Sequence, residues 1–329
     1  MTAAYFRSVL VNARLVAGVF FLSLSLGGCA LLLPQTDALR QTWPAGLASQ
    51  VELTEVPFFP QRDYECGPAA LATVLTHAGA RVTVDELVKE VYIPARRGSL
   101  QAEMLAAPRR HDVVSYRLAP RFEDVLREIA TGTPVIVLQD YGVWPISLWH
   151  YAVVVGYDAD TGEVVLRSGE KRRLTMPLAV LEYTWKESKY WAMVTVPPGR
   201  VPATANEADY LTAIIAFERV AGARASATAF AAFLKRWPDN VTASIGLANA
   251  LYAQGELGET EAVLSKTAAR HPDAVVVLNN LAQVLADQQR YREALTVIER
   301  AIALGEGPFS PAVRETRDMI RKHLNGNAN

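Results

Sequence analysis

Apolar residues recur every three to four positions through much of residues 67–130, a spacing typical of helices that bury one face. Pro68 suits the first turn of the earliest helix, and Gly79 suits its end. A capping box at Thr83–Glu86 opens the next helix. The pattern predicts helices over residues 67–79, 83–91, 99–109 and 122–130.

Shorter apolar runs follow, and the pattern changes from helix to strand. It predicts strands at Val135–Gln139, Tyr151–Tyr157, Val164–Arg167 and Trp191–Val196. Helices first and strands later are typical of an α+β domain. We place this domain at residues 51–197, ahead of a proline-rich linker at residues 198–206.

The rest of the chain has a helical pattern that repeats every 34 residues. This separation joins Pro238 and Pro272, Ala248 and Ala282, Leu251 and Leu285, Leu257 and Tyr291, and Leu264 and Ile298. The period and its small and large apolar positions resemble the tetratricopeptide repeat. We expect an all-α domain of stacked repeats over residues 207–325, with units at 241–274 and 275–308, a degenerate unit at 207–240 and a capping helix after Pro311. An ordinary helical bundle is the alternative.

The N-terminus has the features of an export signal. Two arginines, Arg7 and Arg14, precede an apolar run over Leu15–Leu26. This run is shorter than the about 20 residues that a helix needs to cross a bilayer. It ends in Leu26-Gly27-Gly28-Cys29, and small residues before a cysteine resemble a bacterial lipobox.

The lipobox resemblance implies that residues 1–29 are a signal peptide with its lipobox, and that cleavage leaves an acylated Cys29 at the new N-terminus. An uncleaved anchor and a plain secretory signal are the alternatives. Ala30 stands where an aspartate would indicate retention in the inner membrane. We therefore expect a lipoprotein of a Gram-negative outer membrane that faces the periplasm, with residues 30–50 as a tether.

Charge and cysteine content narrow the classes of function. The formal net charge of the 329 residues is −1, which argues against a nucleic-acid partner. The chain has two cysteines, so acylation of Cys29 leaves Cys66 without a partner for a disulfide or for a zinc site with two thiolates. The sequence has no glycine-rich phosphate loop and no histidine-rich metal pattern. We expect neither a cofactor nor a metal.

A lone exported cysteine is explained by a reactive thiol, and a buried inert thiol is the alternative. Cys66 directly precedes the first predicted helix, where unpaired N–H groups favour an anion, so we expect a lowered pKa for its thiol. The thiolate is the attacking form. Gln61 lies five residues earlier, and its side-chain amide could converge with the Cys66 backbone N–H on a developing oxyanion.

A thiol nucleophile needs a base, and the chain has five histidines. His77 lies on the helix of Cys66, three turns away, and His111 lies in a polar stretch. His271 and His323 belong to the repeats. His150 opens a predicted strand, which would fix its position. We therefore take His150 as the candidate base, with a satisfied core histidine as the alternative.

Gln61, Cys66-Gly67-Pro68-Ala69-Ala70 and the later segment His150–Tyr157 together resemble the bacteriocin-processing, double-glycine peptidases of the papain-like clan. The resemblance is closer to their stand-alone periplasmic relatives with C-terminal repeats, and it covers residues 54–197. It implies a papain-like fold, with helices packed on an antiparallel sheet. It also implies thiol attack on a peptide carbonyl, an acyl-enzyme and its hydrolysis.

This family orients its histidine with an aspartate or asparagine on the next strand, and the present chain has neither there. If Tyr157 lies opposite Glu163, His150 lies opposite Glu170. Side-chain alternation then puts Ser168 and Glu170 on the face of His150. Ser168 fills the expected position and is the first candidate for the orienting residue. Glu170 is the alternative.

Three functions are compatible with these residues. The first is a thiol peptidase that hydrolyses a periplasmic peptide or protein, for example after a pair of glycines, while the repeats hold the substrate or a partner protein. The second is a catalytically weak papain-like binding scaffold, an adaptor lipoprotein, which the missing acid favours. The third is acyl transfer by the same thiol to an amine.

Overall fold

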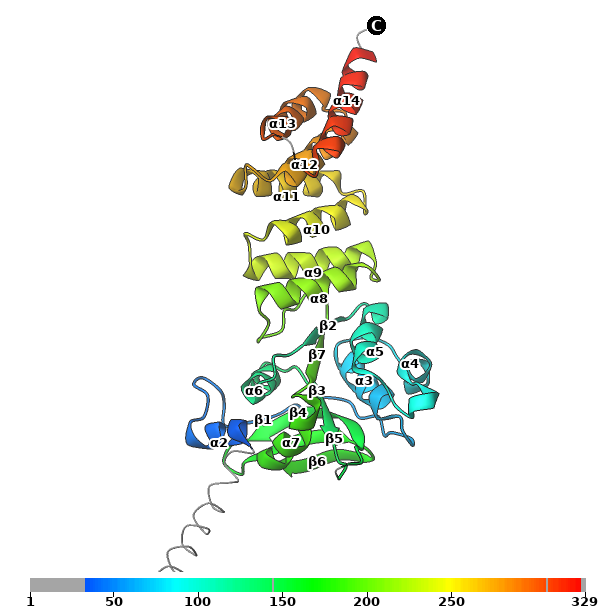
Figure 1. Ribbon diagram of the computed structural model, residues 1–329, viewed down its shortest axis with the longest axis vertical. Coiled ribbons are helices and arrows are strands. Elements are labelled where there is room, and N and C mark those ends of the chain that lie inside the picture. Colours follow the sequence, from blue (N-terminus) through cyan, green and yellow to red (C-terminus); the bar gives the residue numbers. More distant parts are fainter. Residues whose placement is uncertain (1–32, 144, 306, 327–329) are drawn as a thin grey trace, which may run out of the picture. The chain divides into compact units, whose positions relative to one another are not determined.

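The computed structural model describes residues 33–143, 145–305 and 307–326, and Figure 1 shows the order of the helices and strands. The predicted lipobox with Cys29 lies outside these residues. The described chain divides into two compact units. The first is formed by residues up to 74, 94–98 and 117–194, and the second by residues 75–93, 99–116 and those from 195 onward. The predicted domain boundaries stay predictions.

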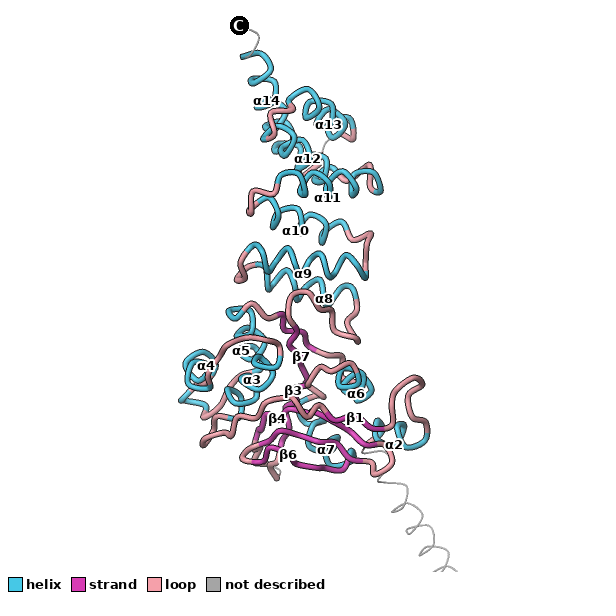
Figure 2. Tube along the Cα trace, turned by 180° about the vertical axis from the view of Figure 1, so that it is seen from behind, coloured by secondary structure: helices cyan, strands magenta, loops and turns pink. Residues whose placement is uncertain are grey.

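An antiparallel sheet is the framework of the α+β region, as Figure 2 shows in magenta. Its strands are β1 (Gln50–Glu52), β2 (Val114–Arg117), β3 (Val135–Asp140), β4 (Trp149–Asp158), β5 (Glu163–Ser168), β6 (Lys171–Pro177) and β7 (Ala192–Val196). Their order is β2-β7-β3-β4-β5-β6, and β1 pairs with β4. The predicted strands correspond to β3, β4, β5 and β7, and the predicted α+β class is confirmed. The pattern missed β1, β2 and β6, because these strands lack the long apolar runs of the four predicted strands.

The helices of this region are α3 (Cys66–His77), α4 (Val84–Val91), α5 (Gln101–Ala106), α6 (Phe122–Ala130) and α7 (Leu178–Trp185). The predicted capping box is present, because the Thr83 hydroxyl accepts the N–H of Glu86 and the Glu86 carboxylate accepts the N–H of Thr83. The helix predicted at residues 99–109 is shorter. It changes to a 3-10 helix at Ala107–His111, where Pro108 has no N–H to continue the α-helical bonds.

The described part of the expected tether, residues 33–50, contains a folded helix, α2 (Pro34–Gln41). This helix buries Thr36 and Leu39. The N–H groups of a first helical turn have no partner within the helix. In α2, those of Gln35 and Thr36 donate to the carboxylate of Glu182 in α7, at 3.0 Å and 2.6 Å. This segment therefore packs against the α+β region instead of extending away from it.

The β4–β5 hairpin has a register that the sequence predicted only in part. At the turn Asp158 faces Glu163, so the expected pairing of Tyr157 with Glu163 is wrong by one residue. A bulge between Val154 and Gly156 then takes up one residue. On the side of the bulge nearer to His150, Val154 pairs with Leu166 and Val153 with Arg167, as expected. The bulge lies where β1 pairs with β4, and a Cβ on Gly156 would be 2.7 Å from the carbonyl oxygen of Val51.

The repeat helices are α8 (Glu207–Glu218), α9 (Ala223–Arg236), α10 (Val241–Tyr252), α11 (Leu257–Arg270), α12 (Val275–Asp287), α13 (Tyr291–Ala303) and α14 (Ser310–Gly326). The starts of α8, α10 and α12 are 34 residues apart, and so are those of α9, α11 and α13. The predicted all-α repeat region is confirmed, and even its degenerate first unit keeps the period.

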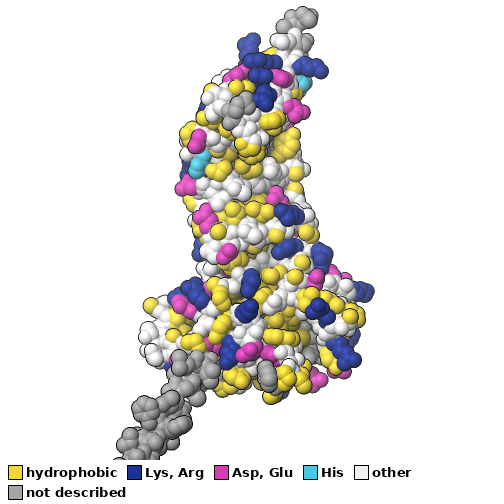
Figure 3. All heavy atoms as spheres, viewed as in Figure 1, with side chains coloured by type: hydrophobic (Ala, Val, Ile, Leu, Met, Phe, Trp, Pro, Cys, Tyr) yellow, Lys and Arg dark blue, Asp and Glu magenta, His cyan; other side chains and the backbone are white. Residues whose placement is uncertain are grey.

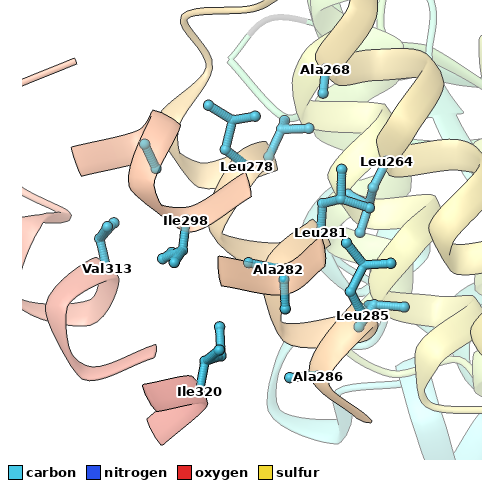
Figure 4. Close-up of a cluster of buried hydrophobic side chains, with 14 of the residues drawn as sticks. Leu264, Ala268, Leu278, Leu281, Ala282, Leu285, Ala286, Ile298, Val313 and Ile320 are labelled. Carbon is cyan, nitrogen blue, oxygen red and sulfur yellow. The ribbon is translucent and has the colours of Figure 1, made fainter. Parts of the chain in front are cut away.

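Buried aliphatic side chains join neighbouring repeat helices into a continuous core. Figure 4 shows Leu285 of α12, Ile298 of α13 and Ile320 of α14 in one such cluster. Gly246 of α10 is needed for close packing, because a Cβ there would lie 2.4 Å from the Phe230 ring. On the outside, Figure 3 shows basic and acidic side chains interspersed.

Candidate active site

Cys66 is the first residue of α3 and is partly buried. Two residues earlier, Tyr64 has a φ of 65°, a left-handed conformation that is rare for a bulky side chain. The Tyr64 ring lies under the guanidinium of Arg97, 5.5 Å from it. The chain therefore makes a constrained turn just before the thiol, and strain of this kind is typical of functional sites.

The Cys66 thiol has a raised pKa, which corrects the expectation of a lowered one. Burial is the largest cause, since it penalises the thiolate. Hydrogen bonds from the backbone N–H groups of Tyr151, Gly67 and Cys66 lower the pKa, as expected at a helix start, but do not outweigh burial. The resting sulfur is therefore a neutral thiol at neutral pH.

His150 lies in β4, directly opposite Gln139 of β3. Its Nε2 is 2.8 Å from the Ser168 hydroxyl oxygen at the end of β5. The imidazole stacks on the ring of Tyr141, with centroids 5.3 Å apart and planes 26° apart. Burial lowers the pKa of His150 to about 4, so the imidazole is neutral at neutral pH.

A small cavity brings several of the predicted residues together. Gln61, Cys66 and Ser168 line it, along with Tyr151, the residue that follows His150. The segment of Gln61 is held by a hydrogen bond from its backbone N–H to the Gly169 carbonyl at 3.2 Å. Among the described residues, the His150 ring makes no hydrogen bond to the thiol. The link between them is the Tyr151 N–H, which faces the sulfur.

The two candidates for the orienting residue have different environments. Ser168 is half-buried and bonds the imidazole, whereas Glu170 is exposed in the turn between β5 and β6. Gly169 between them has a φ of 62°, which turns the chain away after Ser168. The geometry thus directs a hydroxyl, and not a carboxylate, to His150.

Sequence reasoning missed the polar groups behind Ser168. A side-chain hydrogen bond joins Ser168 to the Tyr141 hydroxyl. That hydroxyl donates to Gln139 Oε1 at 3.0 Å, and Gln139 Nε2 donates to the Thr184 hydroxyl at 2.7 Å. The available signal was Gln139 itself, a polar residue that ends the apolar run Val135–Leu138 and is fully buried.

An exposed apolar loop, the 141–149 hairpin, connects β3 to β4 and leads directly into His150. Val143 is 82% exposed and Ile146 is 74% exposed, which is unusual for side chains of this size. Asp140 Oδ1 ties the two ends of the hairpin together, because it accepts the N–H groups of Gly142 at 2.8 Å and Leu148 at 2.7 Å. An exposed apolar segment therefore directly precedes the candidate base in the chain.

The repeat region has a groove of its own, a cavity of ≈ 320 Å³ between α9, α10 and α11. Leu234, Leu247 and Val263 contribute apolar surface to it, and Lys235 and Lys266 contribute positive charge. Within the described ranges, no three His, Cys, Asp or Glu side chains cluster as a metal site would require. No helix in the same ranges is long and apolar enough to cross a bilayer.

Family models match most of the described chain. The Peptidase C39 like family matches residues 53–193, and tetratricopeptide-repeat models match residues 211–274 and 276–306. No curated protein matches the chain.

Solved structures of both kinds resemble parts of the chain. A Bacillus anthracis protein described as a C39-like peptidase is 18% identical over 45% of this chain and 98% of its own, with a TM-score of 0.39. The peptidase domain of Streptococcus ComA, a bifunctional ABC transporter, is 17% identical over 44% and 99%, with a TM-score of 0.36. The TPR2B domain of yeast Sti1 is 17% identical over 31% and 84%, with a TM-score of 0.30. All three TM-scores are below 0.5, so the family models alone identify the peptidase-like region and the repeats.

Proposed function

Because the chain carries a C39-like peptidase domain at residues 53–193, followed by tetratricopeptide repeats, we propose that it is a thiol peptidase with Cys66 as nucleophile and His150 as base. One observation carries the proposal: the Cys66 thiol lies at a helix start and faces the N–H of Tyr151, the residue that follows His150 in the sequence. Gln61 lines the same cavity, so a nucleophile and an oxyanion donor are available together.

The protonation states favour a general-base reaction over a preformed ion pair. The thiol and the imidazole are both neutral at rest, because burial raises the pKa of Cys66 and lowers that of His150. His150 therefore takes the thiol proton as the sulfur attacks the peptide carbonyl carbon. The oxyanion receives hydrogen bonds from the Cys66 N–H and the Gln61 amide. The carbon–nitrogen bond then breaks, His150 gives its proton to the leaving amine, and the acyl group stays on the sulfur as a thioester.

Water completes the cycle. His150 accepts a proton from a water molecule, whose oxygen attacks the acyl carbon of the thioester. The carbon–sulfur bond breaks, the peptide leaves as a carboxylic acid, and the proton returns to the sulfur. An amine in place of water would give acyl transfer by the same steps, with an amide as the product.

The repeats and the N-terminus suggest where this reaction takes place. We place a protein partner or the substrate on the tetratricopeptide repeats, since such repeats are typical of protein-interaction domains. The groove between α9, α10 and α11 offers apolar and basic side chains for this purpose. Acylation of Cys29 would hold the protein at the outer membrane, on its periplasmic side.

A binding scaffold is the second candidate. It is favoured by the raised pKa of Cys66 and by the imidazole, which bonds Ser168 and not the thiol. A scaffold would keep the papain-like fold and the repeats but would have an ordinary, unassisted thiol.

Alkylation of Cys66 separates the two candidates. We expect the alkylation of Cys66 by an iodoacetamide probe at pH 7, measured on the full chain in detergent, to depend on His150, so that the His150→Gln variant loses about 100-fold or more of the wild-type rate. The matched control is His323→Gln in the last repeat helix, which should leave the rate unchanged. An ordinary rate that is unaffected by His150→Gln would support the scaffold. The substrate itself is the protein that accumulates uncut in a strain carrying Cys66→Ala.

A further inference from the structure

The hydrogen-bond partner of His150 is a neutral hydroxyl, and a hydroxyl can either donate or accept. A carboxylate in this position can only accept, and so it forces a proton onto the imidazole nitrogen that faces it. Ser168 by itself sets no such condition on His150. What Ser168 does depends on the groups behind it.

Those groups form a continuous hydrogen-bonded chain within the first compact unit. It runs from His150 Nε2 to the Ser168 hydroxyl at 2.8 Å, and then to the Tyr141 hydroxyl. From Tyr141 it continues to Gln139 Oε1 at 3.0 Å, and from Gln139 Nε2 to the Thr184 hydroxyl at 2.7 Å. It ends in α7, because the Thr184 hydroxyl donates to the Val180 carbonyl at 3.0 Å.

The last acceptor fixes the direction of every bond. A carbonyl oxygen cannot donate, so the Thr184 hydrogen points to the backbone and the Thr184 oxygen accepts from the Gln139 NH₂ group. Gln139 Oε1 then accepts, and the Tyr141 hydroxyl donates to it. The Tyr141 oxygen is left as the acceptor for the Ser168 hydrogen. The Ser168 oxygen is left as an acceptor for His150.

We propose that Tyr141 and Gln139 are positioning residues that act through Ser168 to hold the proton of neutral His150 on Nε2, which leaves the lone pair on Nδ1. This inference rests on the proposed function for its purpose, since Nδ1 is then the nitrogen available as the base for Cys66. This row of hydrogen bonds takes the place of the carboxylate or amide that the family places on the next strand. It selects the tautomer without supplying a charge, which agrees with an imidazole that stays neutral.

Packing holds the chain in this arrangement. The Gln139 side chain is fully buried, and the Tyr141 ring stacks on the imidazole that its hydroxyl helps to orient. Gln139 and Thr184 are both buried, so reversing the bond between them would leave a buried donor or acceptor unpaired, at a cost of about 1–3 kcal/mol. Such one-directional networks reinforce each bond through the next.

The tautomer can be measured directly in the full chain in detergent micelles, with ¹⁵N-labelled histidine and long-range ¹H–¹⁵N correlation spectra at pH 7. The His150 signals are assigned by their loss in His150→Gln. We expect Nε2 to carry the proton and Nδ1 to be unprotonated. A proton on Nδ1 in the wild type would overturn the inference.

Tyr141→Phe keeps the stacked ring and removes only the hydroxyl. The Ser168 hydrogen then loses its acceptor and turns to Nε2, so we expect His150 to shift toward the Nδ1–H form and the alkylation rate of Cys66 to fall about tenfold or more. The matched control is Tyr183→Phe on the exposed face of α7, which should change neither. An unchanged tautomer in folded Tyr141→Phe would also overturn the inference.

The two proposals fail in different ways. A wild-type protein that has the Nε2–H tautomer but cleaves no peptide and alkylates slowly would refute the peptidase and leave the positioning chain intact. A protein that cleaves peptide with the proton on Nδ1 would do the reverse.

Discussion

The two candidate catalytic residues, Cys66 and His150, are both neutral, unlike a thiolate–imidazolium pair. Burial raises the pKa of Cys66 and lowers that of His150 to about 4, and the residue beside the imidazole is the uncharged Ser168. In the proposed reaction, attack would therefore require proton transfer from Cys66 to His150, and the direction of the hydrogen bonds around His150 would matter more than charge.

The low pKa of His150 also links the site to stability. The ordinary pKa of histidine is about 6.5, so below that value the unfolded chain binds a proton that the folded chain does not. This group therefore contributes a loss of stability as the pH falls from about 6.5 through 4. Above pH 6.5 it has no effect, since both states are neutral.

Ser168→Asp tests this account at a single position. A carboxylate beside Nε2 stabilises the imidazolium, so we expect the pKa of His150 to rise above its present value of about 4, toward or beyond 6.5. Cys66 alkylation at pH 6 should then rise, because the imidazolium can hold a thiolate. The measurement is an NMR titration of the His150 signals with the alkylation rate from pH 4 to 8. Ser265→Asp on α11 is the exposed control, and a pKa still near 4 in Ser168→Asp would contradict the account.

The 141–149 hairpin is the element that the sequence pattern described least well. It contains no charged residue, and its side chains Val143 and Ile146 face solvent, while Asp140 ties together the backbone at its two ends. An exposed apolar segment that leads into the candidate base is suited to binding apolar side chains of a peptide, because such contacts remove apolar surface from water.

We expect Val143→Ser and Ile146→Ser each to raise the KM for peptide cleavage about tenfold, since burying one such side chain contributes about 1.5 kcal/mol. The alkylation rate of Cys66 by small iodoacetamide should not change, because the probe does not need the hairpin. Val220→Ser, an exposed valine of the repeat region, is the matched control. Equal KM values in all three variants would assign the hairpin some other role.

The whole protein combines a peptidase-like region, a repeat array and an expected lipid anchor. Acylation of Cys29 would make the protein partition with membranes, provided that two or more chains are attached, because one chain gives only marginal binding. We expect the wild type in a Gram-negative host to enter the detergent phase in phase-separation assays and the Cys29→Ser variant to stay in the aqueous phase. Wild-type protein in the aqueous phase would refute the anchor.

Periodicity along the chain was enough to predict the repeats and the main helices and strands. The 34-residue spacing survives in the starts of α8, α10 and α12 because each repeat buries its apolar face on the next, so the pattern and the packing share one cause. The pairing of Cys66 and His150 was likewise proposed from local signals, a helix start and a strand start, and the roles of both residues remain predictions.

Long-range packing settled what those signals could not. The bulge in β4 lies where β1 pairs with Gly156, and the first turn of α2 is bound by Glu182, which is far away in sequence. The pKa of Cys66 is raised because tertiary burial outweighs the helix start. The row of hydrogen bonds behind Ser168 and His150 joins Gln139 and Thr184, which are 45 residues apart in sequence. Local patterns carry no information on burial or on such distant partners, because both arise only when separate elements pack together.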